Sequence, residues 1–340
     1  MSENPSFSCQ WHNGSAITDA TCRILQDRLD IHTSQEQFCV DFSVIQNFKL
    51  LNYQLMIETP TFTIGLSGLG HQTESFFEKL WQVYNRRCEE ALFIDSSAMY
   101  VGEGDFLFSE QDFTQQGLAK IALYPQCLAI YPQNSHARRF PFCFSADPVL
   151  DGYRIQLILD TADSLQISRL GRNTLDIFDK ICRQRSHIIQ QWQEKHLELE
   201  EQLISRLGEK ASNYQQMQQL GCQMTCGLYT ADNECFWFAG LHNGKAAVEL
   251  VTSEQTATYL YQYDSTDTFF ANTLRHAMES AALHREVIFT DLSDKPLYQM
   301  TVQRSRFIQF LRDHNTGRII HNSGWSTALS SFFQTDHLLK

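Results

Sequence analysis

The feature that most constrains the fold is an internal repeat, because the chain matches itself at a nearly constant offset. Residues 64–80, IGLSGLGHQTESFFEKL, align with residues 165–181, LQISRLGRNTLDIFDKI. Identical residues stand at six aligned pairs, which are Ser67 and Ser168, Leu69 and Leu170, Gly70 and Gly171, Thr73 and Thr174, Phe77 and Phe178, and Lys79 and Lys180. The match continues upstream through Tyr53 and Tyr153. We therefore expect at least two copies of one module, in a chain whose 340 residues suit two or three domains.

Each copy has the pattern of several short strands followed by one helix. In the second copy, apolar and polar residues alternate with a period of two, and Pro and Gly separate the segments. The predicted strands are Leu118–Tyr124, Cys127–Tyr131, Arg139–Ser145, Tyr153–Leu159 and Leu165–Leu170. Thr73 and Thr174 stand where an N-cap residue would begin the closing helix. This pattern predicts an α+β fold with antiparallel sheets.

Residues 221–325 show the same order of elements and are predicted to form a third copy. Its strands are expected at Cys226–Thr230, Cys235–Leu241, Ala246–Thr252 and Thr256–Tyr263, with a helix beginning near Asp267. Beyond that helix we expect a strand at Arg285–Asp291, a helix at Tyr298–Asp313, a short strand at Gly317–His321 and a loose tail at 326–340.

A long helix is predicted to connect the second and third copies over residues 174–220. From Thr174 to about Leu207 the sequence contains no Pro and no Gly, and Ala211–Leu220 resumes a helical pattern. Apolar residues recur every eleven positions, as in Ile177 and Ile188, which is typical of a nearly straight helix. The helix either packs on its own module or serves, over 174–207, as a spacer or an oligomerising helix.

A small antiparallel sandwich or barrel closed by a C-terminal helix resembles the pleckstrin-homology (PH) superfold. The segments ARRFPFCF (137–144), GYRIQLILDT (152–161) and SRLGRNT (168–174) also resemble an uncharacterised bacterial family with PH-like modules. The resemblance implies tandem PH-like modules at 1–92, 93–190 and, as a third, 221–325. It implies no particular activity.

Composition narrows the classes of function. The net charge of −12 argues against a general nucleic-acid binder, whose affinity would come from neutralising phosphates. The ten cysteines are spread along the chain, which suits reduced thiols in the cytoplasm, where we expect the protein. The polar start is unlike a secretory leader, and no apolar run reaches the length of a membrane span.

The glycine and cysteine spacings do not match the common motifs for binding a dinucleotide cofactor or zinc. The glycines of 65–70 are spaced GxxGxG rather than GxGxxG, and the second copy keeps only the last of them. The set Cys222, Cys226, Cys235 and His242 has no common zinc spacing. We therefore expect no metal, no cofactor and no catalytic residues.

The candidate binding residues are Arg138, Arg139, Arg169 and Arg172. They give the second copy positive charge where the first has Gly68 and His71 at the positions of Arg169 and Arg172. Guanidinium groups near a helix N-terminus suit an anion or an acidic partner. Ordinary surface pairing with neighbouring aspartates is the alternative.

The leading hypothesis is a non-enzymatic cytoplasmic adaptor or scaffold that binds protein partners. Modules of this shape can accept a peptide along an open sheet edge. The first alternative is a peripheral membrane protein that binds anionic lipid headgroups through the arginines. The second alternative is an enzyme with an unrecognised site.

Overall fold

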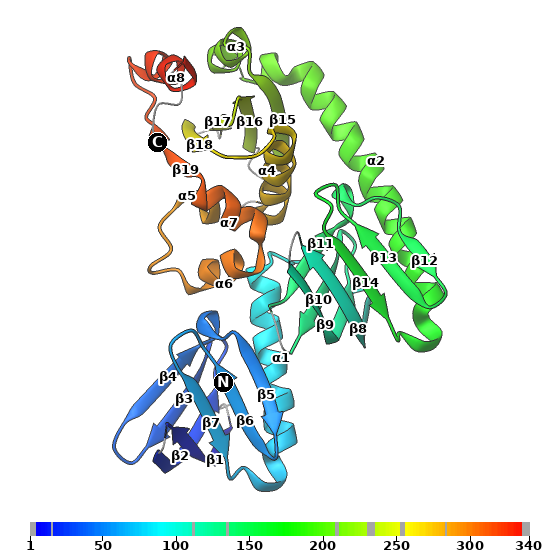
Figure 1. Cartoon of the computed structure of the whole chain (residues 1–340), viewed down its shortest axis with the longest axis vertical. Coiled ribbons are helices and arrows are strands. Elements are labelled where there is room, and N and C mark those ends of the chain that lie inside the picture. The colour runs from blue at the N-terminus through cyan, green and yellow to red at the C-terminus, as the bar shows by residue number, and fades with distance from the viewer. Residues whose placement is uncertain are drawn as a thin grey trace. The chain divides into compact units, whose positions relative to one another are not determined.

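The computed structural model describes residues 5–14, 16–110, 113–133, 136–207, 211–229, 235–251, 256–282 and 284–334. The chain forms two compact units (Figure 1). Unit 1 comprises Met1–Phe140, Ala146–Cys182 and Asp291–Ser305, and unit 2 comprises Pro141–Ser145, Arg183–Thr290 and Arg306–Lys340. Both units combine antiparallel sheets with helices, so the α+β prediction is confirmed.

Unit 1 begins with a seven-stranded antiparallel sheet in the order β4-β3-β2-β1-β7-β6-β5. The strands are β1 (Ser6–Asn13), β2 (Ala16–Ile24), β3 (Arg28–Thr33), β4 (Gln37–Asp41), β5 (Asn47–Leu51), β6 (Gln54–Glu58) and β7 (Thr63–Ser67). A 3₁₀ turn, Gly70–Gln72, leads into α1 (Thr73–Ala91). Figure 1 shows this curled sheet in blue, with α1 running along it in cyan.

A second seven-stranded sheet in unit 1 has the corresponding order β11-β10-β9-β8-β14-β13-β12. Its strands are β8 (Tyr100–Glu110), β9 (Phe113–Leu123), β10 (Cys127–Pro132), β11 (Arg138–Pro141), β12 (Val149–Asp151), β13 (Arg154–Ile158) and β14 (Ser164–Ser168). The 3₁₀ turn Gly171–Asn173 then leads into α2 (Thr174–Leu207). Hereafter module 1 is Ser6–Ala91, and module 2 is Tyr100–Phe140 with Ala146–Cys182.

The period-two alternation places side chains as the sequence predicts. In β13, Ile155 and Leu157 are buried, whereas Arg154 and Ile158 are exposed. A strand alternates its side chains between two faces, so one face of the sheet joins the core and the other meets solvent.

Two local predictions for these modules are wrong. The predicted strand Arg139–Ser145 ends at Pro141, which has no N–H for the ladder, and continues as the 3₁₀ turn Phe142–Phe144. Thr73 and Thr174 are not N-caps. They already have helical backbone, and their hydroxyls donate to the carbonyls of Gly70 (2.8 Å) and Gly171 (2.9 Å).

Both modules and a distant segment share one hydrophobic core. Phe76 and Leu80 of α1 lie in the same buried cluster as Ala129 and Tyr131 of β10 and Met300. Met300 belongs to α6 (Pro296–Arg304), which returns to unit 1 from late in the chain. Unit 1 is therefore closed by residues from three separate stretches of sequence.

Two side chains of α6 make the buried polar contacts of this return. The Thr301 hydroxyl donates to the carbonyl of Ala91 at 2.6 Å. The Arg304 guanidinium, only 2% exposed, donates to the Tyr84 hydroxyl and, at 3.0 Å, to the Met300 carbonyl. The bonds to Ala91 and Tyr84 fix α6 against the C-terminal half of α1.

Unit 2 contains a five-stranded sheet whose strands follow chain order. The strands are β15 (Gln223–Tyr229), β16 (Cys235–His242), β17 (Lys245–Val251), β18 (Thr256–Gln262) and β19 (Asn315–Ile319). The helices are α3 (Ala211–Gln219), α4 (Asp267–Ala281), α5 (Glu286–Phe289), α7 (Arg306–Asp313) and α8 (Trp325–Gln334). Residues 183–207 of α2 also belong to unit 2. The region expected to be a third copy thus differs from the first two in strand order.

Several predictions for this region need correction. Arg285–Asp291 contains the helix α5 rather than a strand, and Tyr298–Asp313 is interrupted at Ser305 between α6 and α7. The expected loose tail at 326–340 is helical up to Gln334, because Leu329 and Phe333 are buried in the unit 2 core. Residues 335–340 lie outside the described residues.

The connecting helix has the predicted start and nearly the predicted extent. It runs as α2 to Leu207 and resumes as α3 at Ala211, while residues 208–210 lie outside the described part. None of the described helices is long and apolar enough to cross a lipid bilayer.

Candidate functional site

A cleft of about 900 Å³ lies on module 2, where the β12–β13 hairpin meets the turn before α2. Arg154, Arg169 and Arg172 line it, together with Tyr153 and the carboxylate of Asp151. We call this site the arginine cleft. Two of its three arginines, Arg169 and Arg172, were predicted from the sequence.

The backbone that shapes the cleft is repeated in module 1. Gly171 has φ +62°, and the corresponding Gly70 has φ +58°. Each glycine is the first residue of a 3₁₀ turn. The carbonyl oxygen of each glycine accepts a hydrogen bond from the hydroxyl of the threonine three residues later. A residue without Cβ adopts this left-handed conformation at little cost, so the same turn forms twice.

The side chains at this shared backbone differ in charge. Module 2 has Arg154, Arg169 and Arg172, whereas module 1 has uncharged Gln54 and Gly68 and the imidazole of His71. The duplication therefore provides a comparison within one molecule: the same turn occurs with and without guanidinium groups.

Arg169 has an unusual backbone for its residue type. Its φ is +59°, in the left-handed region that glycine favours, and the corresponding Gly68 has φ +73°. The Arg169 side chain is 76% exposed, and its guanidinium lies 3.4 Å from Asp105. An exposed pair of this length contributes little stability, so it does not account for the strained backbone.

Arg154 is the cleft residue that sequence reasoning missed. The signal was present, because the alternation in β13 places it on the exposed face and it follows Tyr153 of the repeat alignment. Among the described residues, neither Arg154 nor Arg172 forms an ion pair.

Arg138 and Arg139 are not part of the arginine cleft. Both lie on β11, at the opposite edge of the module 2 sheet from β12. The Arg138 guanidinium stacks over the Phe108 ring at 5.7 Å and lies 3.9 Å from the Glu110 carboxylate. The four predicted arginines thus divide into two groups, and only Arg169 and Arg172 share a cleft.

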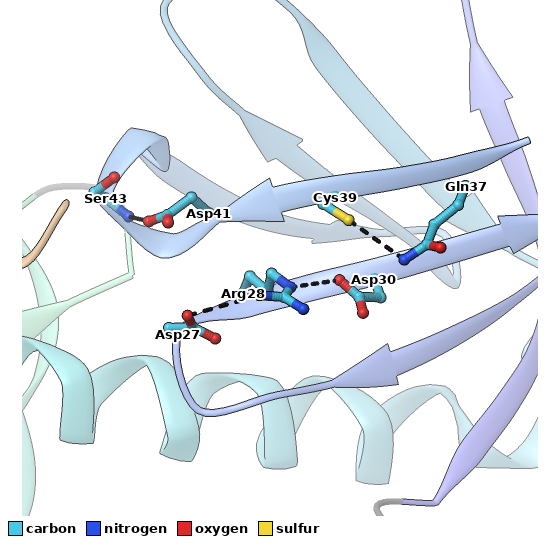
Figure 2. Close-up of polar contacts among 7 residues, drawn as sticks. All are labelled: Asp27, Arg28, Asp30, Gln37, Cys39, Asp41 and Ser43. Carbon is cyan, nitrogen blue, oxygen red and sulfur yellow. Dashed lines mark hydrogen bonds and ion pairs between the residues drawn. The ribbon is translucent and has the colours of Figure 1, made fainter. Parts of the chain in front are cut away.

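A second polar cluster lies on β3 and β4 of module 1 (Figure 2). Arg28 Nε donates to the Asp30 carboxylate at 2.9 Å, and Gln37 Nε2 lies 3.7 Å from Cys39 Sγ. Desolvation and the neighbouring Asp30 raise the pKa of the exposed Cys39 thiol. A raised pKa keeps the thiol protonated, which is the opposite of what a nucleophilic cysteine needs.

A third cluster, in unit 2, contains a hydroxyl, an imidazole and a carboxylate. Glu249 is fully buried, accepts from Asn213 (2.7 Å) and from Thr258, and lies 3.1 Å from His321 Nε2. Thr258 Oγ1 contacts the same Nε2 at 2.8 Å. A relay would need the carboxylate and hydroxyl on different ring nitrogens, so this arrangement is structural.

The described residues contain no group of three or more His, Cys, Asp or Glu side chains able to hold a metal ion. Cys222, one of the four residues considered above as zinc ligands, is buried. Burial and the charge of Asp267 raise the pKa of its thiol to about 11.

Comparisons with known proteins give only distant structural likeness. No protein-family model matches the chain, and no curated protein matches it. One similar solved structure is the C-terminal domain of an unknown protein from Leishmania infantum, with 19% identity, a TM-score of 0.22, and coverage of 24% of this chain and 82% of that one. Another is the Spt16D–Pob3N heterodimer, with 18% identity, a TM-score of 0.21, and coverage of 47% and 86%.

Proposed function

We propose that this protein is a non-enzymatic scaffold whose tandem PH-like modules bind a protein partner, with the arginine cleft of module 2 as the recognition site. The PH-like assignment is supported by the element order, since each module has seven antiparallel strands followed by one helix. The third region, with its different strand order, is not included in this proposal.

The observation that carries the proposal is the difference between the two modules. Three arginines line one cleft of module 2, and the same backbone positions in module 1 carry Gln54, Gly68 and His71. Guanidinium groups bind carboxylates and phosphates through paired hydrogen bonds, so the expected partner presents an acidic group.

The shared core of unit 1 supports a scaffold role. In addition to the common hydrophobic cluster, the amide of Phe48 in β5 donates to the carbonyl of Gln133 at 3.3 Å. The hydroxyl of Tyr124 in module 2 donates to Glu89 of α1 at 3.1 Å. Two modules held in this way present their surfaces in one fixed arrangement, which lowers the entropic cost of binding a partner.

The test is affinity purification of the full-length protein from its own cells, followed by mass spectrometry. The cleft variant replaces the three arginines with the module 1 residues: Arg154→Gln, Arg169→Gly and Arg172→His. Arg23→Gln, at an exposed arginine of β2, is the matched control. We expect a stoichiometric partner that the wild type and the control retain and the cleft variant loses. Recovery of the protein alone, or equal recovery of the partner with the cleft variant, would contradict the proposal.

A second candidate is peripheral membrane binding, and one observation favours it. Tyr153 is 74% exposed and lines the arginine cleft. Leu175 is 60% exposed and lies in the first turn of α2. Apolar and basic residues together are typical of surfaces that contact anionic lipids. The net charge of −12 opposes approach to an extended anionic surface, so we rank this candidate second.

A further inference from the structure

We propose that the arginine cleft binds a phosphate monoester, presented as a phosphorylated side chain of the protein partner. This inference rests on the proposed function and adds the chemical class of the group that is recognised. It draws on the charge of the cleft lining, the backbone of Arg169 and the acidic character of the whole chain.

The guanidinium groups of the lining suit a phosphate. Arg154, Arg169 and Arg172 line the cleft with the carboxylate of Asp151, and Arg169 also pairs with Asp105, so positive charge still exceeds negative charge at the cleft. A phosphate monoester carries close to two negative charges at neutral pH, and its oxygens can accept from several guanidinium groups at once. A carboxylate has two acceptor oxygens, whereas a phosphate monoester has three strong ones to share among the three guanidinium groups.

The backbone of Arg169 supports the assignment together with its place in the cleft. Arg169 has a left-handed backbone, and the aligned residue of module 1 is Gly68. A non-glycine residue is strained there, and strain of this kind is found where the surrounding structure or a bound group makes use of the side chain. Among the described residues, its guanidinium donates to the Asp105 carboxylate at 3.4 Å.

The whole chain favours a single compact anion over an anionic surface. A net charge of −12 opposes approach to an anionic lipid bilayer or a polynucleotide, whereas a local cleft can still attract one phosphate group. Tyr153, at the cleft, offers an exposed ring for the residues beside the phosphorylated side chain.

The experiment titrates the full-length protein with N-acetyl-O-phosphoserine amide and follows the ¹⁵N-labelled guanidinium signals by NMR. N-acetyl-serine amide and N-acetyl-glutamate amide are the matched ligands. We expect the phosphorylated ligand to bind at least about tenfold more tightly than the glutamate ligand, with shifts confined to the cleft arginines. The cleft variant should lose at least about tenfold in affinity, and Arg23→Gln should bind as the wild type does.

A gain-of-function variant provides an independent check. Gln54→Arg combined with His71→Arg places guanidinium groups at the corresponding turn of module 1 and leaves Gly68 unchanged. We expect this variant to bind a second equivalent of the phosphorylated ligand.

Three results would overturn the inference. They are equal affinity for the phosphorylated and glutamate ligands, unchanged affinity in the cleft variant, and binding of phosphatidylserine vesicles through the cleft without binding of the phosphorylated ligand. If the cleft variant still loses the cellular partner while the phosphorylated ligand does not bind, the scaffold proposal stands and only the phosphate inference fails.

Discussion

At the scale of single residues, the repeat separates what a turn requires from what a side chain adds. Gly70 and Gly171 both provide the left-handed residue that begins the 3₁₀ turn, and the carbonyl of each accepts a hydrogen bond from a threonine hydroxyl. Gly68 and Arg169 share a second left-handed position, but only one of them is a glycine. The folded backbone accommodates arginine at this left-handed position, and replacing Arg169 with glycine would measure how much stability the arginine costs.

We predict that Arg169→Gly stabilises the protein by about 1 kcal/mol, because glycine adopts the left-handed conformation without the clash of Cβ. The lost pair with Asp105 is exposed and contributes little. Chemical denaturation of both proteins measures the difference. Gly68→Ala is the reciprocal control and should destabilise, since a Cβ there would lie 3.2 Å from Gln10 Cγ. A less stable Arg169→Gly protein would contradict the prediction.

His136 gives a prediction about pH. Burial and the charges of Arg304 and Arg138 lower the pKa of His136 to about 3, and its Nδ1 is buried without a hydrogen-bond partner among the described residues. In the unfolded chain a histidine titrates near 6.5. Between these values the unfolded chain binds the extra proton, so the stabilisation present above about pH 6.5 is lost as the pH falls toward 3.

We therefore expect His136→Gln to reduce the dependence of unfolding free energy on pH by up to about 1.4 kcal/mol per pH unit in that range. Urea denaturation at a series of pH values measures this slope. His71→Gln, which changes an exposed histidine of module 1, is the control. If the two variants behave alike, His136 is not the group responsible.

At the scale of elements, α6 is a short helix that residues far from it in the sequence hold in place. The contacts that hold it include the Thr301 bond to Ala91, the Arg304 bond to Tyr84 and the burial of the Met300 side chain. The guanidinium of Arg304 also lies 5.6 Å from the Tyr84 ring centroid, which adds a cation–π contact. A helix of nine residues has little stability by itself, so these contacts hold it in place.

We predict that Arg304→Ala lowers the unfolding free energy by about 2–4 kcal/mol, because it leaves the buried Tyr84 hydroxyl and Met300 carbonyl without a charged donor. Denaturant unfolding measures the loss. Lys295→Ala, at the exposed start of α6, is the control and should change stability by less than about 0.5 kcal/mol. A similar small effect for both variants would show that Arg304 does not hold the helix.

At the scale of the whole molecule, the compact units do not follow the linear order of the predicted modules. The sequence suggested boundaries at 92 and 190, whereas unit 1 joins both modules to Asp291–Ser305. The chain therefore passes between the two units more than once. A fragment cut at a sequence-based boundary would lack part of the unit 1 core.

We predict that the fragment 1–190 is less stable than unit 1 in the full chain, because removing α6 exposes the apolar surface that Met300 covers. Adding a synthetic peptide of residues 291–305 should raise its melting temperature in a dose-dependent way. The same peptide with Arg304→Ala is the control and should have a smaller effect. A fragment that gains nothing from the wild-type peptide would contradict the prediction.

Local sequence was enough to predict the repeat, the alternating strands of module 2 and the long helix from Thr174. These depend on period, turn residues and short-range hydrogen bonds, which neighbours along the chain control. The sequence also predicted Arg169 and Arg172 as binding residues, because the aligned residues of the first copy are Gly68 and His71. Long-range packing was needed to place Arg138 apart from the cleft and to return α6 to unit 1. Those outcomes depend on strand order and on packing between residues far apart in sequence, and neither leaves a periodic signal in the chain.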